Sequence, residues 1–401
     1  MVLPLDGIRV LDLSSVVMGP LATQLLADQG ADVIVVEDRR GDTNRSMGAG
    51  PHPDLSGVSL NLMRNKRSIG LDIRDPMGHE VLLGLVGRSD VVVTNLRPGS
   101  RARARITYDD LRAVRPDLVY CAAAGYPVDG PDADRPAYDD VVQAGSGLVD
   151  LMERVGLPPS LLPTLVADKT AGLVVANVVT AALLRRERTG VGGEFTVAMA
   201  EVMRAYVLAE HGAAAVPDPP LGSSGYQRIL NPLRRPQRTA DGRINVLPYE
   251  REHYETIFRA GGRDDLVGDE RILSRRSRLA NGESLYRDVA AILEQRTTTE
   301  WLALLRAAGI PVSEVATVDD LLDGLPLAEH PHGGSYRVVP PLTGRAAAAD
   351  VVRLPAPLHG EHGREILAEL GHDAAVIDRL VAEGVVYGTG VGPPPGLPSR
   401  P

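Results

Sequence analysis

The chain has 401 residues, 44% of them hydrophobic and 24% charged, which is typical of a folded globular protein with room for two domains. The formal net charge of -9 argues against nucleic acid and anionic membranes as partners, so an anionic ligand would need a local basic cluster. A single cysteine excludes an internal disulfide and any CxxC metal site, and we expect a cytoplasmic protein.

The N-terminal sequence MVLPLDGIRVLDL lacks the basic region and apolar region of a secretory signal. No apolar run approaches the ~20 residues that a membrane-spanning helix needs. We therefore expect neither a targeting signal nor a membrane span.

The first half of the chain alternates short β-branched runs with helical periodicity, which predicts an α/β domain with a parallel sheet buried on both faces. The first strand–helix–strand unit combines a strand at 8–13, a helix from Gly19-Pro20 to Leu26 and a strand at 32–37. Two further runs, 90–94 and 118–122, predict additional strands of the same sheet.

The clearest helix is predicted at 170–186, where apolar residues recur at the spacing of one buried face. A stretch rich in Pro, Gly and Ser at 216–234 indicates a linker or loop. Beyond it we expect helices at 301–310, 364–370 and 373–382, followed by a disordered tail rich in Gly and Pro.

The loop after the first strand, SSVVMGPLA, lacks the G-x-G-x-x-G pattern that brings backbone close to a pyrophosphate. Although the opening resembles a dinucleotide-binding domain, we therefore expect no nicotinamide or flavin cofactor.

Arginines gather in one part of the first half of the chain, with further cations upstream. The group comprises Arg97, Arg101, Arg103, Arg105, Arg112 and Arg115, preceded by Lys66, Arg67, Arg39 and Arg40. Such a group would suit an anion that carries several phosphates. It is equally typical of a solvated face paired with Asp109 and Asp110. Base stacking on nucleic acid is disfavoured because aromatic residues are only 3% of the chain.

Asp168 immediately precedes the strong helix, in the segment PTLVADKTAG. Its ordinary interpretation is an N-cap, worth ~1 kcal/mol. The same helix terminus would keep the carboxylate ionised, the form that a nucleophile needs. Ala167 and Ala171 would leave room for a ligand beside it.

Other catalytic residue types are sparse in this half of the chain. No histidine lies between His79 and His211, so neither a Ser-His-Asp set nor a two-histidine metal site can form locally. His359 and His362 are interpreted as ordinary turn residues, and Cys121 as an inert core residue. We predict no metal site.

Nine segments, in order along the chain, resemble class III CoA transferases, the CaiB/BaiF or formyl-CoA transferase-like family. They lie at 5–37, 65–78, 89–100, 116–131, 135–148, 166–193, 239–246, 299–315 and 354–371, and include NKRSIGLDIRDPMG, SDVVVTNLRPGS and VADKTAGLVVANVV. The ordered set covers most of the chain and is far more specific than any one motif.

The resemblance implies a Rossmann-like large domain, an inserted smaller α/β domain and an interlocked homodimer. The corresponding boundaries are 1–210 for the N-terminal part of the large domain, 211–235 for a linker, 236–325 for the small domain, 326–388 for a return segment and 389–401 for the tail.

The resemblance also implies the chemistry. Asp168 would attack an acyl-CoA to form an aspartyl anhydride, which the released CoA thiolate would convert to an aspartyl-CoA thioester, and a carboxylic acid would reverse both steps. CoA and acyl-CoA are thus substrates, and no permanently bound cofactor is expected. The residues assigned to CoA are Arg39, Lys66, Asn95, Leu96, Arg103 and Arg135.

This chain departs from formyl-CoA transferases beside the catalytic aspartate. Val17, followed by Met18, stands where those enzymes carry a glutamine, so a larger or more apolar acyl group is expected instead of oxalate. Their glycine-run loop is absent, and Gly222 and Gly225 are the nearest candidates for a lid.

Two alternatives differ in chemistry. The family includes α-methylacyl-CoA racemases, whose catalytic histidine position is Tyr138 here, with Glu250 near a further racemase acid. Tyrosine, with an ordinary pKa of ~10, is a poor base at neutral pH, so transfer is favoured over racemisation. The second alternative is a protein that binds acyl-CoA without turnover, which the retained Asp168 disfavours.

Overall fold

A computed structural model describes residues 2–343 and 351–390. The chain divides into two compact units. The first unit comprises Met1–Ser146, Leu161–Tyr206 and Leu325–Pro401, and the second comprises Gly147–Ser160 and Val207–Gly324.

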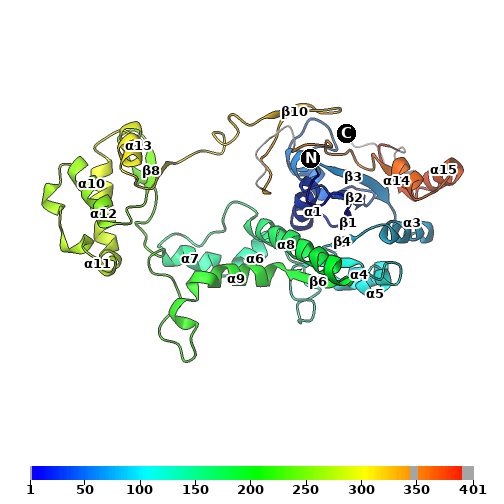
Figure 1. Ribbon diagram of the computed structural model, residues 1–401, viewed down its shortest axis with the longest axis horizontal. Helices are drawn as coiled ribbons and strands as arrows, with labels where there is room; N and C mark the ends of the chain where they lie inside the picture. The colour runs from blue at the N-terminus through cyan, green and yellow to red at the C-terminus, as the bar shows by residue number, and fades with distance from the viewer. Residues whose placement is uncertain (1, 344–350, 391–401) are drawn as a thin grey trace. The chain divides into compact units, whose positions relative to one another are not determined.

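The first unit is built on a seven-stranded sheet of order β12-β3-β2-β1-β4-β5-β6 (Figure 1). All neighbouring strands are parallel except β12, which runs antiparallel to β3 at one edge. The strands are β1 (Arg9–Leu13), β2 (Asp32–Glu37), β3 (Lys66–Leu71), β4 (Val91–Thr94), β5 (Val119–Ala124), β6 (Gly193–Ala198) and β12 (Val386–Tyr387). This confirms the predicted α/β class with a parallel sheet.

Both faces of the sheet are covered, so its central strands are almost wholly apolar. On one face, Leu11, Ile34 and Val92 lie in register and join a core with helices α3 (Pro76–Gly87), α14 (Gly363–Glu369) and α15 (Ala374–Ala382). On the other face α1 (Met18–Asp28) packs against α8 (Val166–Thr189), and α8 also contacts β5.

The remaining elements of the first unit connect the strands or cover the sheet. The helices are α2 (Gly57–Leu62), α3 (Pro76–Gly87), α4 (Pro98–Ala104), α5 (Tyr108–Arg112), α6 (Asp139–Gly145), α14 (Gly363–Glu369) and α15 (Ala374–Ala382), with the short turn η1 (Thr43–Ser46). A separate hairpin joins β10 (Leu327–His330) to β11 (Gly334–Arg337), and α9 (Met199–His211) runs across the division into the second unit.

The chain leaves β1 toward β2 and β3 on one side, and later returns through β4, β5 and β6 on the other. The connections that follow β1 and β4 therefore diverge at the carboxyl ends of these strands. In open α/β sheets this reversal is where a crevice forms and ligands bind.

The second unit combines a three-stranded antiparallel sheet with helices around Trp301. The strands are β7 (Gln237–Arg238), β8 (Arg243–Val246) and β9 (Val312–Glu314). The helices are α7 (Leu148–Arg154), α10 (Arg251–Ala260), α11 (Arg275–Ala280), α12 (Gly282–Leu293) and α13 (Thr298–Ala307), with η2 (Ala213–Ala215), η3 (Asp264–Leu266) and η4 (Glu270–Ile272). Trp301 is fully buried in its apolar core and donates its indole N–H to the carbonyl of Leu293 at 2.8 Å.

Helix α8 differs from its prediction in two respects. It begins at Val166, which places Asp168 inside the first turn, and its length and composition would suffice to cross a bilayer, contrary to the expectation that no such run exists. A helix of a protein core passes the same test, and α8 packs on α1 and β5. Apart from Thr389 and Gly390, the tail predicted at 389–401 lies outside the described residues.

Candidate active site

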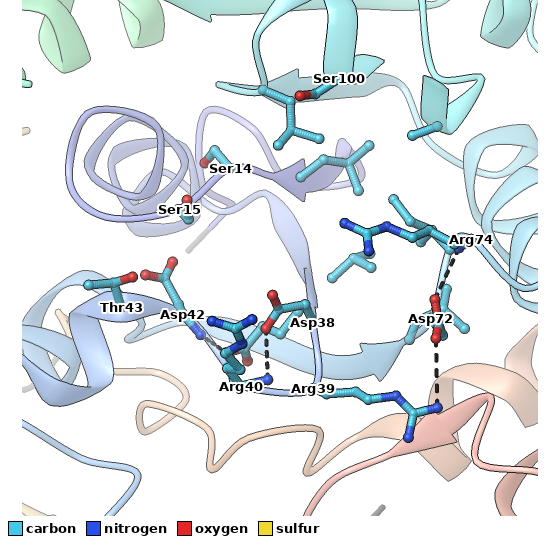
Figure 2. Close-up of a pocket in the computed structure, with 18 of the residues that line it drawn as sticks. Ser14, Ser15, Asp38, Arg39, Arg40, Asp42, Thr43, Asp72, Arg74 and Ser100 are labelled. Atoms are coloured by element: carbon cyan, nitrogen blue, oxygen red, sulfur yellow. Dashed lines mark hydrogen bonds and ion pairs between the residues drawn. The ribbon is translucent and has the colours of Figure 1, made fainter. Parts of the chain in front are cut away.

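A cavity of about 860 Å³ opens at the carboxyl ends of β1 to β4 (Figure 2). Its lining comes from the segments that follow these strands, including Ser14 and Ser15 after β1, residues 38–43 after β2 and residues 72–74 after β3. Ser100 and Arg103 of α4 complete it. The volume is in the usual range for sites that hold a small molecule or cofactor.

A buried ion pair lies beneath the loop that follows β1. Lys66 and Asp12 are both fully buried, and the Lys66 Nζ lies 3.2 Å from Asp12 Oδ2 and also donates to Thr23 Oγ1 at 2.7 Å and to the Pro20 carbonyl at 2.9 Å. Every proton of the ammonium group is thus used inside the core. Lys66 was expected to bind phosphate, but its burial keeps it away from the cavity and is not compatible with that role.

The cavity carries several cations. Arg39, Arg74 and Arg103 line it from three different segments, together with Arg40. The Arg39 guanidinium forms an ion pair with Asp72 at 3.6 Å and donates to the Gly384 carbonyl at 2.7 Å. It also lies over the ring of Tyr387, 5.2 Å from the ring centroid. Planar guanidinium groups converging from separate segments are what a ligand with several phosphates requires.

Most of the other predicted arginines are engaged elsewhere. Arg97 donates to the Asp134 carbonyl at 2.9 Å, Arg112 pairs with Asp109 at 3.0 Å, and Arg135 pairs with Asp132 at 3.6 Å. None of these three lines the cavity. For Arg97 and Arg112 the interpretation as a surface face fits, and Arg103 is the member of the group at 97–115 that lines the cavity.

Asn95 and Leu96 follow β4 and have different positions. The Asn95 amide donates to the Ser15 carbonyl at 2.7 Å and accepts from the Ser15 N–H at 3.1 Å, so Asn95 fixes the loop that lines the cavity. Leu96 is itself exposed in the cavity wall.

Asp168 lies in the first turn of α8, and the helix terminus is capped by a different residue. Asp139, buried at the start of α6, accepts from the backbone N–H of Ala167 at 2.7 Å and of Asp168 at 3.0 Å through Oδ2. Asp139 therefore satisfies two of the free N–H groups at this end of the helix. The N-cap interpretation of Asp168 is wrong, because the helix begins before it.

The carboxylate of Asp168 is left without stabilising bonds. Its side chain is half-buried and accepts no hydrogen bond within the described parts of the chain, 2–343 and 351–390. Burial, reinforced by the charge of Asp139, raises the pKa of Asp168 to about 6. The pKa therefore rises where the helix terminus alone would have lowered it, yet the group is still mostly ionised at neutral pH.

A close helix contact joins the start of α1 to the start of α8. A Cβ atom on Gly172, one turn after Asp168, would come within 2.8 Å of the Met18 carbonyl and 3.2 Å of the Leu21 side chain. Ser15 lines the cavity and Met18 follows it by three residues. The segment from 15 to 18 therefore runs from the cavity wall to the helix turn next to Asp168. Val17 and Met18 are both buried there.

A family model described as CoA-transferase family III matches residues 5–371. The chain belongs to CoA-transferase family III. A probable fatty acyl-CoA transferase of Mycobacterium tuberculosis is 34% identical over 91% of this chain and 98% of its own length. A mouse succinyl-CoA:glutarate CoA-transferase is 29% identical over 96% of this chain and 90% of its own length. The crystal structure of a CaiB/BaiF family protein from Brucella suis superimposes with a TM-score of 0.77 at 28% identity, covering 92% of this chain and all of that one. The chain is thus a class III CoA transferase.

The family resemblance also singled out Tyr138, Glu250, Gly222 and Gly225. Tyr138 precedes α6 and is 67% exposed, while Glu250, in the second unit, pairs with Arg278 at 3.1 Å. Gly222 and Gly225 also belong to the second unit, where the Gly225 N–H donates to the His211 carbonyl at 2.7 Å. Their role as a lid stays a prediction.

Two further expectations concern the thiol and metals. Cys121 is fully buried in β5, and burial raises the pKa of its thiol to about 12, which suits an inert core residue. Within 2–343 and 351–390, no group of three potential metal ligands occurs.

Some residues that line the cavity were not found from the sequence. Arg74, Ser14, Ser15 and Thr43 line the cavity although none was singled out. The available signal was positional, since each lies shortly after β1, β2 or β3, whose carboxyl ends open onto the cavity.

Proposed function

We propose that this enzyme moves CoA from an acyl-CoA to a carboxylic acid through covalent intermediates on Asp168. The observation that carries the proposal is the state of this carboxylate: half-buried, largely ionised at neutral pH and accepting no hydrogen bond within the described residues. A carboxylate that is not committed to a structural bond is available as a nucleophile.

The chemistry needs four attacks, and each conserves the energy of the activated bond. Asp168 attacks the thioester carbonyl and expels CoA thiolate, giving an anhydride. The thiolate then attacks the aspartyl carbonyl, releasing the donor acid and leaving an aspartyl-CoA thioester. The acceptor carboxylate displaces CoA from this thioester to form a second anhydride, and the thiolate attacks its acyl carbonyl to release the new acyl-CoA and free Asp168.

The phosphates of CoA are proposed to lie in the cavity against Arg39, Arg74 and Arg103, with Leu96 beside the adenine end. The pantetheine arm would then follow residues 15–18 toward Asp168. Support for this path comes from the close contact between Met18 and Gly172.

The acyl group is proposed to contact Val17 and Met18, which favours a larger or more apolar acid than oxalate. The relatives differ in their names: the mycobacterial protein is a probable fatty acyl-CoA transferase, whereas others are named for glutarate or mesaconate. A panel of donors and acceptors must therefore span both kinds.

An interlocked homodimer, with the small domain inserted into the large one, is also part of the proposal. Support comes from apolar side chains exposed on the first unit, among them Leu173 and Leu184 of α8. Light scattering during gel filtration tests this, and a monomeric mass at micromolar concentration would count against it.

The function is tested by incubating acyl-CoA donors with oxalate, glutarate, mesaconate and fatty acids, and detecting each new acyl-CoA by mass spectrometry. We expect transfer with the native chain and none with Asp168→Ala, while CoA affinity of the variant stays within about tenfold. Deuterium incorporation at the α-carbon of a branched acyl-CoA without any acceptor would favour a racemase instead.

A further inference from the structure

Asp42 is a buried carboxyl group in the wall of the cavity that the proposed transfer chemistry does not use. It follows β2, begins the short turn η1 and is only 7% exposed. In Figure 2 its side chain extends toward the labelled side chains of Thr43 and Ser15, which also line the cavity.

The two oxygens of Asp42 are in different situations. Oδ1 accepts hydrogen bonds from the backbone N–H of Val16 at 3.0 Å and of Asn44 at 2.9 Å. The first of these bonds holds Val16 at a φ of 73°, an unusual conformation for a β-branched residue. Oδ2 is buried and has no hydrogen-bond partner among residues 2–343 and 351–390. Because a buried polar atom without a partner costs about 1–3 kcal/mol, this oxygen is suited to a ligand.

Among the buried charged groups around Asp42, three carboxylates, Asp42 included, face two cations. Within the protein, Arg45 of η1 is paired with Glu37 at 2.6 Å and Lys66 of β3 with Asp12 of β1 at 3.2 Å. On the cavity side the charged groups are Asp38, Arg39 and Arg40 after β2, Asp72 and Arg74 after β3, and Arg103 of α4. His359 lies near Glu37. Asp12, Glu37 and Asp42 therefore share the two buried cations Arg45 and Lys66, each of which pairs directly with another carboxylate.

This environment makes the carboxyl group easy to protonate. Burial raises the pKa of Asp42 to about 6, against the hydrogen bonds from Asn44 and Val16 that lower it, and the charges of Glu37 and Asp12 raise it further. The pKa of Glu37 shows the contrast: burial would raise it too, but its ion pair with Arg45 holds it at about 2.

We propose that Asp42 is a ligand-binding residue that takes up a proton from solvent when the diphosphate of CoA enters the cavity, and then donates a hydrogen bond to it from Oδ2. The inference rests on the proposed function. A nearby polyanion raises the cost of the Asp42 charge, and protonation replaces this repulsion with a donor on the oxygen that lacks a partner.

The expected size of the effect follows from the titration of one group. With a pKa of about 6, Asp42 is about one-tenth protonated at pH 7, so binding there takes up as much as about 0.9 proton. Because the ligand favours the protonated form, affinity is highest below pH 6. It then weakens by up to about tenfold for each pH unit until the pKa of the complex is reached.

The test uses isothermal titration of the full chain with dephospho-CoA, in buffers that differ in ionisation enthalpy, between pH 5.5 and 8. Dephospho-CoA is chosen because it lacks the 3′-phosphate, a monoester that itself titrates near pH 6. Asp42→Asn keeps an acceptor for Val16 and Asn44 and carries a permanent donor in place of Oδ2. Asp38→Asn, an exposed carboxylate on the same wall, is the matched control.

We expect proton uptake by the native chain and by Asp38→Asn, with affinity falling as pH rises. Asp42→Asn should bind without proton uptake, at all pH values about as tightly as the native chain at low pH. Binding by the native chain without proton uptake would overturn the inference while leaving the proposed function intact, and this result needs no variant. Affinity that rises with pH and is weakened by Asp42→Asn would also overturn it, because Asp42 would then accept from the ligand as a carboxylate. If neither CoA nor dephospho-CoA binds at any pH, the proposed function fails and this inference with it.

Discussion

Replacing Asp168 with asparagine should abolish transfer and at the same time stabilise the first unit at neutral pH. The pKa of Asp168 is about 6 against an ordinary 3.8, so ionising this carboxyl in the folded protein costs about 3 kcal/mol more than in the unfolded chain. The half-buried side chain is partly screened by solvent, and asparagine loses a favourable interaction with the helix terminus. We therefore expect a net gain of about 1–3 kcal/mol in the free energy of unfolding.

The sign of this effect depends on pH. A carboxyl whose pKa is raised by folding destabilises the native state above the unfolded pKa, with the full penalty reached above about pH 6. Well below pH 4 both states are protonated and the penalty vanishes. The gain in Asp168→Asn should thus be present at pH 7.5 and mostly lost at pH 4.

Hydrogen exchange of peptides from α1 and α8 is the suitable assay. The single tryptophan, Trp301, belongs to the second unit, so its fluorescence would report on the other part of the chain. Asp140→Asn, which removes an exposed carboxylate from α6, is the matched control and should change protection little. Equal protection of Asp168→Asn and the native chain at pH 7.5, or the same gain at both pH values, would refute the reasoning.

Three other predictions concern the site and its support. In Asp139→Asn the pKa of Asp168 should fall because a neighbouring negative charge is lost. The acid limb of the pH profile of kcat/KM, expected near pH 6, should therefore move to lower pH. An unchanged profile would show that the ionisation of Asp168 does not govern this limb. Arg103→Ala should weaken CoA binding about tenfold or more by titration calorimetry, whereas Arg112→Ala, whose guanidinium pairs with Asp109 outside the cavity, should leave it unchanged. Gly172→Ala should lower the free energy of unfolding by about 1–3 kcal/mol in a urea titration followed by circular dichroism. An unchanged free energy of unfolding would contradict the close packing of α1 against α8 at this position.

Much of the sheet could be predicted because runs of β-branched residues in the local sequence identify most of its strands. The strand predicted at 32–37 matches β2, and those at 90–94 and 118–122 overlap β4 and β5. The strand β3 was missed, since it opens with Lys66 and Arg67 and reads as a polar segment. Its lysine is buried only because Asp12, two strands away in the sheet, supplies the opposite charge. A pairing of this kind cannot be seen in the local sequence.

The candidate site was predictable in its nucleophile and less so in its surroundings. Asp168 was identified from its motif, but the cap at the start of its helix comes from Asp139, which lies on another helix. Only the fold brings these two carboxyl groups together and raises the pKa of Asp168. Arg74 was likewise missed because it reaches the cavity through the strand order, which no local pattern specifies.

Oxygen labelling tests the central claim most directly. When an acceptor acid labelled with ¹⁸O on its carboxylate is turned over, the attack on the aspartyl thioester places one acceptor oxygen in the anhydride bridge, and the final attack by CoA leaves that oxygen on Asp168. The tryptic peptide covering 155–169 should therefore gain about 2 Da in the first turnover, and up to about 4 Da over many turnovers if the two oxygens of Asp168 exchange positions, with fragmentation assigning the gain to Asp168. New acyl-CoA formed while this peptide stays unlabelled would contradict a covalent role for Asp168.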